Sequence, residues 1–142
     1  MKLHGLQAAL ARGEAAKRVW VTSGDLISGA ALAAAWGVSD AVLSDAVARG
    51  QAFLIFVDGQ PFYPKEFAEL DAETVSTIVR ALGSLCAIEK YFFWRRRHGA
   101  LGGMTVQQVL RSEAPDALKR VAQFARASSA QSDADAAMRS VK

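Results

Sequence analysis

Residues 31–50 hold two short helical patterns that meet at a glycine, and this arrangement restricts the fold more than any other part of the sequence. Small residues favour a first helix, for which Ser28 is a suitable N-cap and which Gly37 would end. Ser39 suits the N-cap of a second helix, which we expect to run to about Arg49 before the next glycine ends it. Two helices joined by so short a glycine-containing turn predict a helix-turn-helix.

A β pattern follows in residues 53–64, where aromatic and β-branched side chains flank the dipeptide Asp58-Gly59. That dipeptide is typical of the two-residue turn of a β-hairpin. Pro61 favours an edge position for the second strand, because proline cannot donate a backbone hydrogen bond. Pro64 suits the first turn of a helix after the hairpin.

The N-terminal segment is less distinctive. Leu3, Leu6 and Leu10 recur at helical spacing, so we expect a short helix that ends at Gly13. Residues 19–22 contain two valines and a tryptophan, which favour a short strand.

The second half of the chain has a helical pattern from Asp71 to His98, which Gly83 divides into two helices. Arginines precede Gly99 and complement a helix C-terminus at that point. The apolar stripe of this segment, expected to be buried, consists of Val75, Ile78, Val79, Leu82, Leu85, Cys86 and Phe92.

Two further helices complete the expected organisation. Thr105 and Gln108 form a capping box for a short helix. Pro115 begins the last helix, whose buried face would contain Leu118, Val121, Ala122 and Ala125. From Ser128 onward the chain is rich in Ala, Ser and Asp, and we expect residues 128–142 to be a disordered tail.

Together these patterns predict an α+β, mainly α protein. We expect a helix-turn-helix module with a small β-hairpin in residues 1–70 and a helical partner-binding domain in residues 71–127. Charge is unevenly distributed: residues 21–80 carry three positive and eight negative charges, whereas residues 81–126 carry eight positive and three negative. Such asymmetry steers charged partners, or lets the two halves attract each other.

The turn chemistry carries a first resemblance. Gly37 lies in the turn, Ala33 lies four residues before it, and Val38, Leu43 and Ala46 take the apolar positions. Residues 26–64 therefore resemble winged helix-turn-helix DNA-binding domains, with the hairpin as the wing. The resemblance implies that the second helix enters the DNA major groove and that a dimer reads two half-sites. The residues expected to contact DNA are Ser39, Ser44, Arg49, Arg95, Arg96 and Arg97.

A second resemblance covers residues 72–126. A tryptophan near a helix end, a Leu-Gly-Gly turn, a short helix and a final helix recur in the toxin-binding domain of MbcA/ParS-type antitoxins. Here Trp94, Leu110 and Val121 take three of these places, and Val106 stands where that family usually has proline. The resemblance implies that a partner enzyme is bound by the loop around Gly99 to Thr105 and by the last helix. The residues expected to contact it are Trp94, Leu101, Gly102, Gly103 and Met104. We expect at least one of Leu101 and Met104 to be substantially exposed.

The sequence gives little support for a metal site or for catalysis. A single cysteine, Cys86, and two histidines, His4 and His98, lack the spacing of a zinc site. Neither a nucleotide-binding loop nor a nucleophile motif occurs, so we expect no catalytic centre, metal or cofactor. The chain lacks a signal-peptide pattern and an apolar run of membrane-spanning length, which favours a cytoplasmic protein.

Two functions remain open. One is an antitoxin-like transcriptional regulator that binds DNA and a cognate toxin or another protein. The other is a protein-interaction adaptor that has a helix-turn-helix shape but does not bind DNA. The acidic residues Asp40 and Asp45 in the second helix favour the adaptor, because DNA affinity depends on cations that neutralise phosphates.

Overall fold

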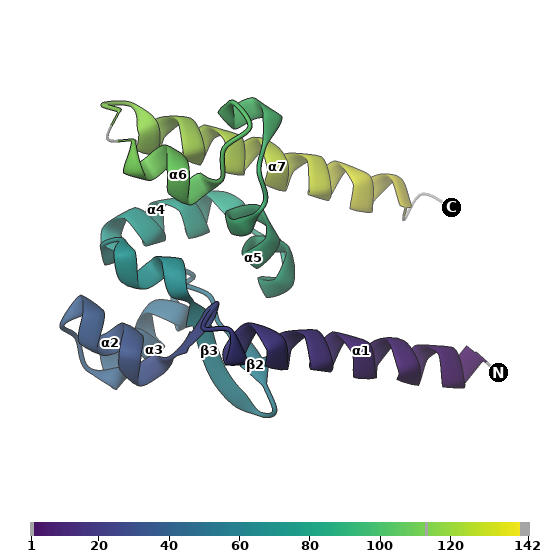
Figure 1. Ribbon diagram of the computed structural model, residues 1–142. Helices are drawn as coiled ribbons and strands as arrows, with labels where there is room; N and C mark the ends of the chain where they lie inside the picture. Colours follow the sequence, from purple (N-terminus) through teal and green to yellow (C-terminus); the bar gives the residue numbers. More distant parts are fainter. Residues whose placement is uncertain (1, 113, 140–142) are drawn as a thin grey trace.

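The computed structural model describes residues 2–112 and 114–139, and its elements form two halves that pack against each other (Figure 1). The elements of the N-terminal half are α1 (Lys2–Thr22), β1 (Leu26–Ser28), α2 (Gly29–Trp36), α3 (Asp40–Ala48), β2 (Ile55–Val57), β3 (Gln60–Pro64) and the 3₁₀ helix η1 (Lys65–Glu69). Those of the C-terminal half are α4 (Ala72–Leu82), α5 (Ala87–Arg95), the 3₁₀ helix η2 (Gly99–Leu101), α6 (Val106–Arg111) and α7 (Ala117–Arg139). The protein is therefore α+β and mainly α, as the sequence predicts.

The helices α2 and α3 form as their capping residues predict. The Ser28 hydroxyl accepts from the Ala31 amide and the Ser39 hydroxyl from the Val42 amide, which satisfies free donors at both N-termini. Gly37 has a φ of 66°, a left-handed conformation that costs glycine little. The two helices are bent by 100° from one another, which is the geometry of a helix-turn-helix.

The predicted hairpin is present, with Asp58 at a φ of 51° and Gly59 at 78°. Two successive positive φ angles define the primed turn that matches the twist of the strands. The expectation that Pro61 places its strand at a sheet edge is wrong, because the strand order is β1-β3-β2. β1 pairs only with residues 62–64, so Pro61 faces a partner strand on the β2 side alone, opposite Phe56. The central strand tolerates proline at position 61 because β1 does not extend to this position and requires no backbone hydrogen bond from it.

The N-terminal helix differs from the expectation. α1 continues through Gly13 and includes the segment expected as a strand, so both of those predictions are wrong. Trp20 packs against Tyr91 with ring centroids 4.8 Å apart, which anchors the C-terminal end of the helix to the other half. A single glycine costs a helix only about 1 kcal/mol, and the alanine-rich flanks offset this.

The predicted division of the C-terminal helices at Gly83 is confirmed, and Val75, Ile78, Val79 and Leu82 are buried as expected. Cys86 is instead exposed, because it is the N-cap of α5 and lies at the surface end of that helix. The expected helix end at Gly99 is also wrong. α5 ends at Arg95, Arg96 is extended, and Gly99 begins η2.

The structure agrees with the sequence predictions for α6 and for the first part of α7. Thr105 and Gln108 form the predicted capping box of α6, and Val121, Ala122 and Ala125 of α7 are buried. α7 then continues as a helix through Arg139, where we expected disorder from residue 128, while residues 140–142 of that expected tail lie outside the described residues. The Ser84 hydroxyl donates to Asp133 at 2.7 Å, so this part of α7 is attached to the α4–α5 turn.

Residues on both sides of position 70 contribute to one connected hydrophobic core. Phe67 lies at its centre, with ring centroids 5.2 Å from Phe53 of the first half and 5.1 Å from Trp94 of the second. Among the described residues, no single helix has the length and composition of a membrane span, although the bent pair α2 and α3 reaches both when taken together.

Candidate interaction surfaces

A groove of about 340 Å³ separates α3 from β3, on the side where the helix-turn-helix and the hairpin meet. Leu43 and Tyr63 line it and are buried, whereas Asp40 and Ser44 of α3 are exposed. Burial raises the pKa of the Tyr63 hydroxyl, and the charge of Asp40 adds to this effect. The groove thus combines apolar side chains with an acidic rim.

Two large apolar side chains are exposed on α3 and on the hairpin, outside the lining of this groove. Val42 of α3 is 54% exposed and Phe56 of β2 is 58% exposed. Phe56 lies opposite Pro61 in the hairpin and points to the same side of the sheet as that residue. Aromatic side chains such as phenylalanine are enriched in protein–protein interfaces relative to the rest of the surface.

The segment that forms α3 and the hairpin has a net negative charge. Residues 29–64 contain three acidic residues and one basic residue, Arg49. The Arg49 guanidinium forms an ion pair with Asp45 at 2.9 Å, one helical turn earlier. Of the expected DNA contacts in α3, Ser39 is the N-cap and uses its hydroxyl on the Val42 amide, and Ser44 is exposed at the groove.

The hairpin turn is fixed to α1 by a charge pair. Arg18 donates to both carboxylate oxygens of Asp58, with distances of 2.8 Å to Oδ1 and 3.0 Å to Oδ2. Hydrogen bonds from Arg18 lower the pKa of Asp58, and the same bonds raise the pKa of Arg18. Both side chains are more than half exposed, so the pair positions the turn without contributing much stability.

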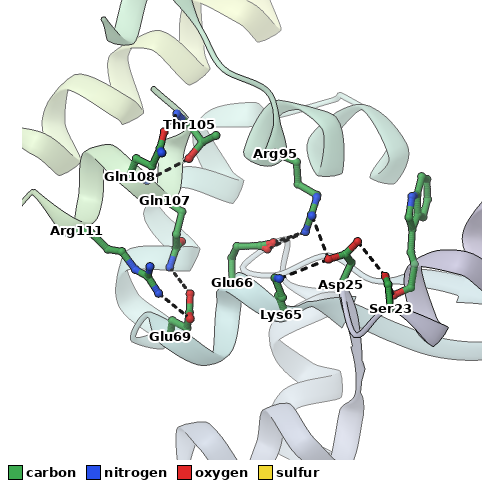
Figure 2. Close-up of polar contacts among 11 residues, drawn as sticks. Ser23, Asp25, Lys65, Glu66, Glu69, Arg95, Thr105, Gln107, Gln108 and Arg111 are labelled. Atoms are coloured by element: carbon green, nitrogen blue, oxygen red, sulfur yellow. Dashed lines mark hydrogen bonds and ion pairs between the residues drawn. The ribbon is translucent and has the colours of Figure 1, made fainter. Parts of the chain in front are cut away.

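Arg95, expected to contact DNA, is instead part of an ionic network between the two halves (Figure 2). Its guanidinium lies 2.8 Å from Glu66 and 3.1 Å from Asp25, and Lys65 approaches the same Asp25 carboxylate at 3.4 Å. Burial raises the pKa of Glu66 even though the charge of Arg95 opposes this. Burial alone would also raise the pKa of Asp25. The hydrogen bond from the Ser23 hydroxyl and the charge of Arg95 outweigh this effect, so the pKa of Asp25 is lowered. With two carboxylates already bound, Arg95 is not free to bind a phosphate.

The other two arginines of the run face solvent. Arg96 and Arg97 are exposed, and the Arg96 guanidinium lies 5.1 Å from the centre of the Phe92 ring. Among the expected DNA contacts of α5 and its C-terminus, these two alone present exposed guanidinium groups.

The expected partner-binding turn is folded inward. Trp94 is fully buried and Leu101 is 1% exposed, whereas Met104 is partly buried against the core. The expectation of a substantially exposed side chain is therefore wrong. The Gly103 amide donates to the His98 carbonyl and the His98 amide to the Met104 carbonyl, which closes the turn and directs Leu101 into the core.

The two glycines of the turn remain accessible. Gly102 has a φ of 68° and Gly103 of 78°, and both are exposed. A Cβ atom added at either position would meet no atom within 4 Å. The backbone of the turn is thus open to solvent, while its apolar side chains are not.

Contacts of α6 with η1 were not anticipated from the sequence. Glu69 accepts from Gln107 at 3.0 Å and forms an ion pair with Arg111 at 2.7 Å (Figure 2). Gln107 is buried, and its Oε1 atom and the Trp94 Nε1 atom are buried without a hydrogen-bond partner in the described part of the chain. Pairing over such a sequence distance has no local signal, so only the folded structure reveals it.

A second groove, of about 420 Å³, lies between α4 and α7. Thr77, Arg80 and Ala81 of α4 and Arg126 of α7 line it. Sequence reasoning missed this site because the two arginines belong to different helices and neither lies in a basic run.

Within residues 2–112 and 114–139, no group of three or more His, Cys, Asp or Glu residues is arranged to hold a metal ion. His98 is engaged elsewhere: its Nε2 atom lies 2.7 Å from the Phe93 carbonyl oxygen, and its ring packs on Phe124.

Comparisons of this chain with protein-family models, with curated proteins and with solved structures found no match.

Proposed function

We propose that this protein is a non-enzymatic interaction adaptor that binds a protein partner through α3 and the hairpin. One observation carries the proposal. The single basic residue of residues 29–64, Arg49, is paired with Asp45, so α3 and the hairpin present the carboxylate of Asp40 together with apolar groups. A nucleic acid would bring its phosphates to an acidic surface, which is unfavourable.

The same features suit a protein segment that is both basic and apolar. Val42 and Phe56 offer apolar contact area, and Asp40 attracts cations. The Arg18–Asp58 pair holds the hairpin turn in place, which lowers the entropy lost when a partner binds.

Site-specific photocrosslinking in the native lysate tests this proposal. A photoreactive amino acid is placed at Val42, at Phe56 and, as a control, at the exposed residue Gln123 of α7. We expect the same protein to crosslink at the first two positions and not at the third. The Val42→Asp and Phe56→Asp variants should abolish its capture without changing the melting temperature. Crosslinks of equal yield at all three positions would contradict the proposal.

An antitoxin-like transcriptional regulator is the second candidate. It is favoured by the element order α1-β1-α2-α3-β2-β3, in which a hairpin follows two helices bent by 100°. Genomic fragments selected by the full chain would distinguish the two candidates. A regulator should enrich a defined DNA sequence and lose that preference when Ser44 and Arg49 are both replaced by alanine. An adaptor should enrich none.

A further inference from the structure

The groove between α4 and α7 places two like-charged side chains together. Arg80 and Arg126 both line it, and each belongs to an exposed position of its helix. No ion pair or hydrogen bond joins either guanidinium to another of the residues that the structure describes, in contrast to Arg18, Arg49, Arg95 and Arg111. Two unpaired guanidinium groups in one groove repel each other, and an anion between them would remove that repulsion.

The other polar groups of the groove do not supply a competing anion. Thr77 donates its hydroxyl proton to the Glu73 carbonyl at 3.0 Å, so the two guanidinium groups provide the donors. Glu73 lies on the same side of α4 as Arg80, seven residues and about 10 Å before it along the helix axis, outside the groove lining. Asp133 lies beyond Arg126 in the opposite direction and accepts from Ser84.

The basic character continues along α7. Lys119 lies seven residues before Arg126, which is about 10 Å along the helix axis and brings the two side chains to the same side. A nucleic acid strand carries a charge about every 3.4 Å of its axis, so one strand can contact both positions. Arginine also suits phosphate, because its planar fork donates two parallel hydrogen bonds to it.

We propose that Arg80 and Arg126 form a phosphate-binding site for the backbone of a nucleic acid, with Lys119 as an additional contact. The site is separate from α3 and does not depend on the proposed adaptor function. It reads no sequence, because contacts to phosphates alone carry no sequence information.

Fluorescence anisotropy with the full chain tests the site. The nucleic acid probes are a labelled single-stranded 20-mer and the corresponding duplex, both at low salt. A labelled poly-glutamate peptide represents an acidic protein. The test variant is R80A/R126A. The control is R12A/R111A, which removes the same charge from two exposed arginines of α1 and α6, and R96A/R97A tests a competing contact at the end of α5.

We expect R80A/R126A to weaken binding of a nucleic acid probe about tenfold, and to reduce the salt dependence by about two phosphate contacts. The control should change the affinity less than about twofold, as a rim charge without a direct contact does. R80K/R126K should recover part of the affinity, because lysine keeps the charge and loses the fork.

Three results would overturn the proposal. One is the absence of binding to both nucleic acid probes at low salt. Another is an equal or larger loss in R96A/R97A, which would place the contact at the end of α5. The third is tighter binding of poly-glutamate than of either probe, which would assign the groove to an acidic protein. Circular dichroism of each variant checks that the fold is intact.

Discussion

Replacement of Arg95 by methionine should destabilise the protein strongly, and in a pH-dependent manner. Methionine keeps most of the apolar stem and removes the charge that faces Glu66 and Asp25 (Figure 2). Asp25 keeps its contacts with Lys65 and Ser23. The Glu66 side chain is only 8% exposed, so the loss of Arg95 leaves a buried carboxylate with a weakened counter-charge.

The magnitude has an upper limit, because a carboxylate that is too costly to keep charged takes up a proton instead. Protonation of a glutamate with an ordinary pKa near 4.3 costs about 3–4 kcal/mol at pH 7 and about 1.5 kcal/mol at pH 5.5. Burial already raises the pKa of Glu66, and loss of Arg95 raises it further. When the folded-state pKa of a carboxyl group is raised, the group lowers the free energy of unfolding above that pKa. This destabilisation disappears as the pH falls toward the pKa of the group in the unfolded state.

Urea unfolding followed by circular dichroism measures this difference. We expect Arg95→Met to lower the free energy of unfolding by about 2–3 kcal/mol at pH 7 and by about half as much at pH 5.5. In the Glu66→Gln background the same replacement should cost about 1 kcal/mol or less, because no charge is then left unpaired. Arg96→Met, at an exposed position, should change stability by less than about 0.5 kcal/mol. A cost that is equal at both pH values and in both backgrounds would refute this reasoning.

Two further predictions concern the start of α4 and the hairpin turn. Asp71 accepts from the Thr74 amide at 2.6 Å, and this bond lowers the pKa of Asp71. Asp71→Ala should therefore cost about 1 kcal/mol at neutral pH, and less as pH falls through the lowered pKa; a constant difference between variant and wild type down to pH 2 would contradict this. Gly59→Val should cost about 1 kcal/mol or more, because Gly59 has a φ of 78°, and an unchanged melting temperature would exclude the left-handed penalty as the cause.

Local signals in the sequence predicted the elements whose ends are fixed by single residues. Ser28, Ser39 and Thr105 cap helices, and Gly37 and Gly59 adopt the left-handed conformations that turns require. These features depend on neighbours within four residues, so they are readable without the fold.

The predictions failed where tertiary contacts determine the extent of a helix or the partner of a side chain. Trp20 extends α1 because it packs on Tyr91, which lies in another helix. Arg95 belongs to a run of three arginines, which favours a phosphate contact, but its guanidinium pairs with Glu66 and Asp25 of the other half. The Arg80–Arg126 groove likewise depends on α4 and α7 being adjacent, and no local pattern specifies this.

The burial of Leu101 within the turn of residues 99–105 changes how a partner at this site must be tested. Leu101 is 1% exposed, so Leu101→Ala should destabilise the protein by roughly 2–5 kcal/mol, as is usual for a leucine removed from a core. Loss of partner capture in that variant would thus report unfolding rather than a lost contact.

Ala100 is the better probe of this turn. It is exposed beside Leu101, and Ala100→Asp adds a charge at the surface of the turn without disturbing the core. If the open backbone at Gly102 and Gly103 contacts a partner, this variant should abolish capture at an unchanged melting temperature. If capture persists, the turn is a structural connection between α5 and α6. A melting temperature that is unchanged in Leu101→Ala would instead refute the burial on which both arguments depend.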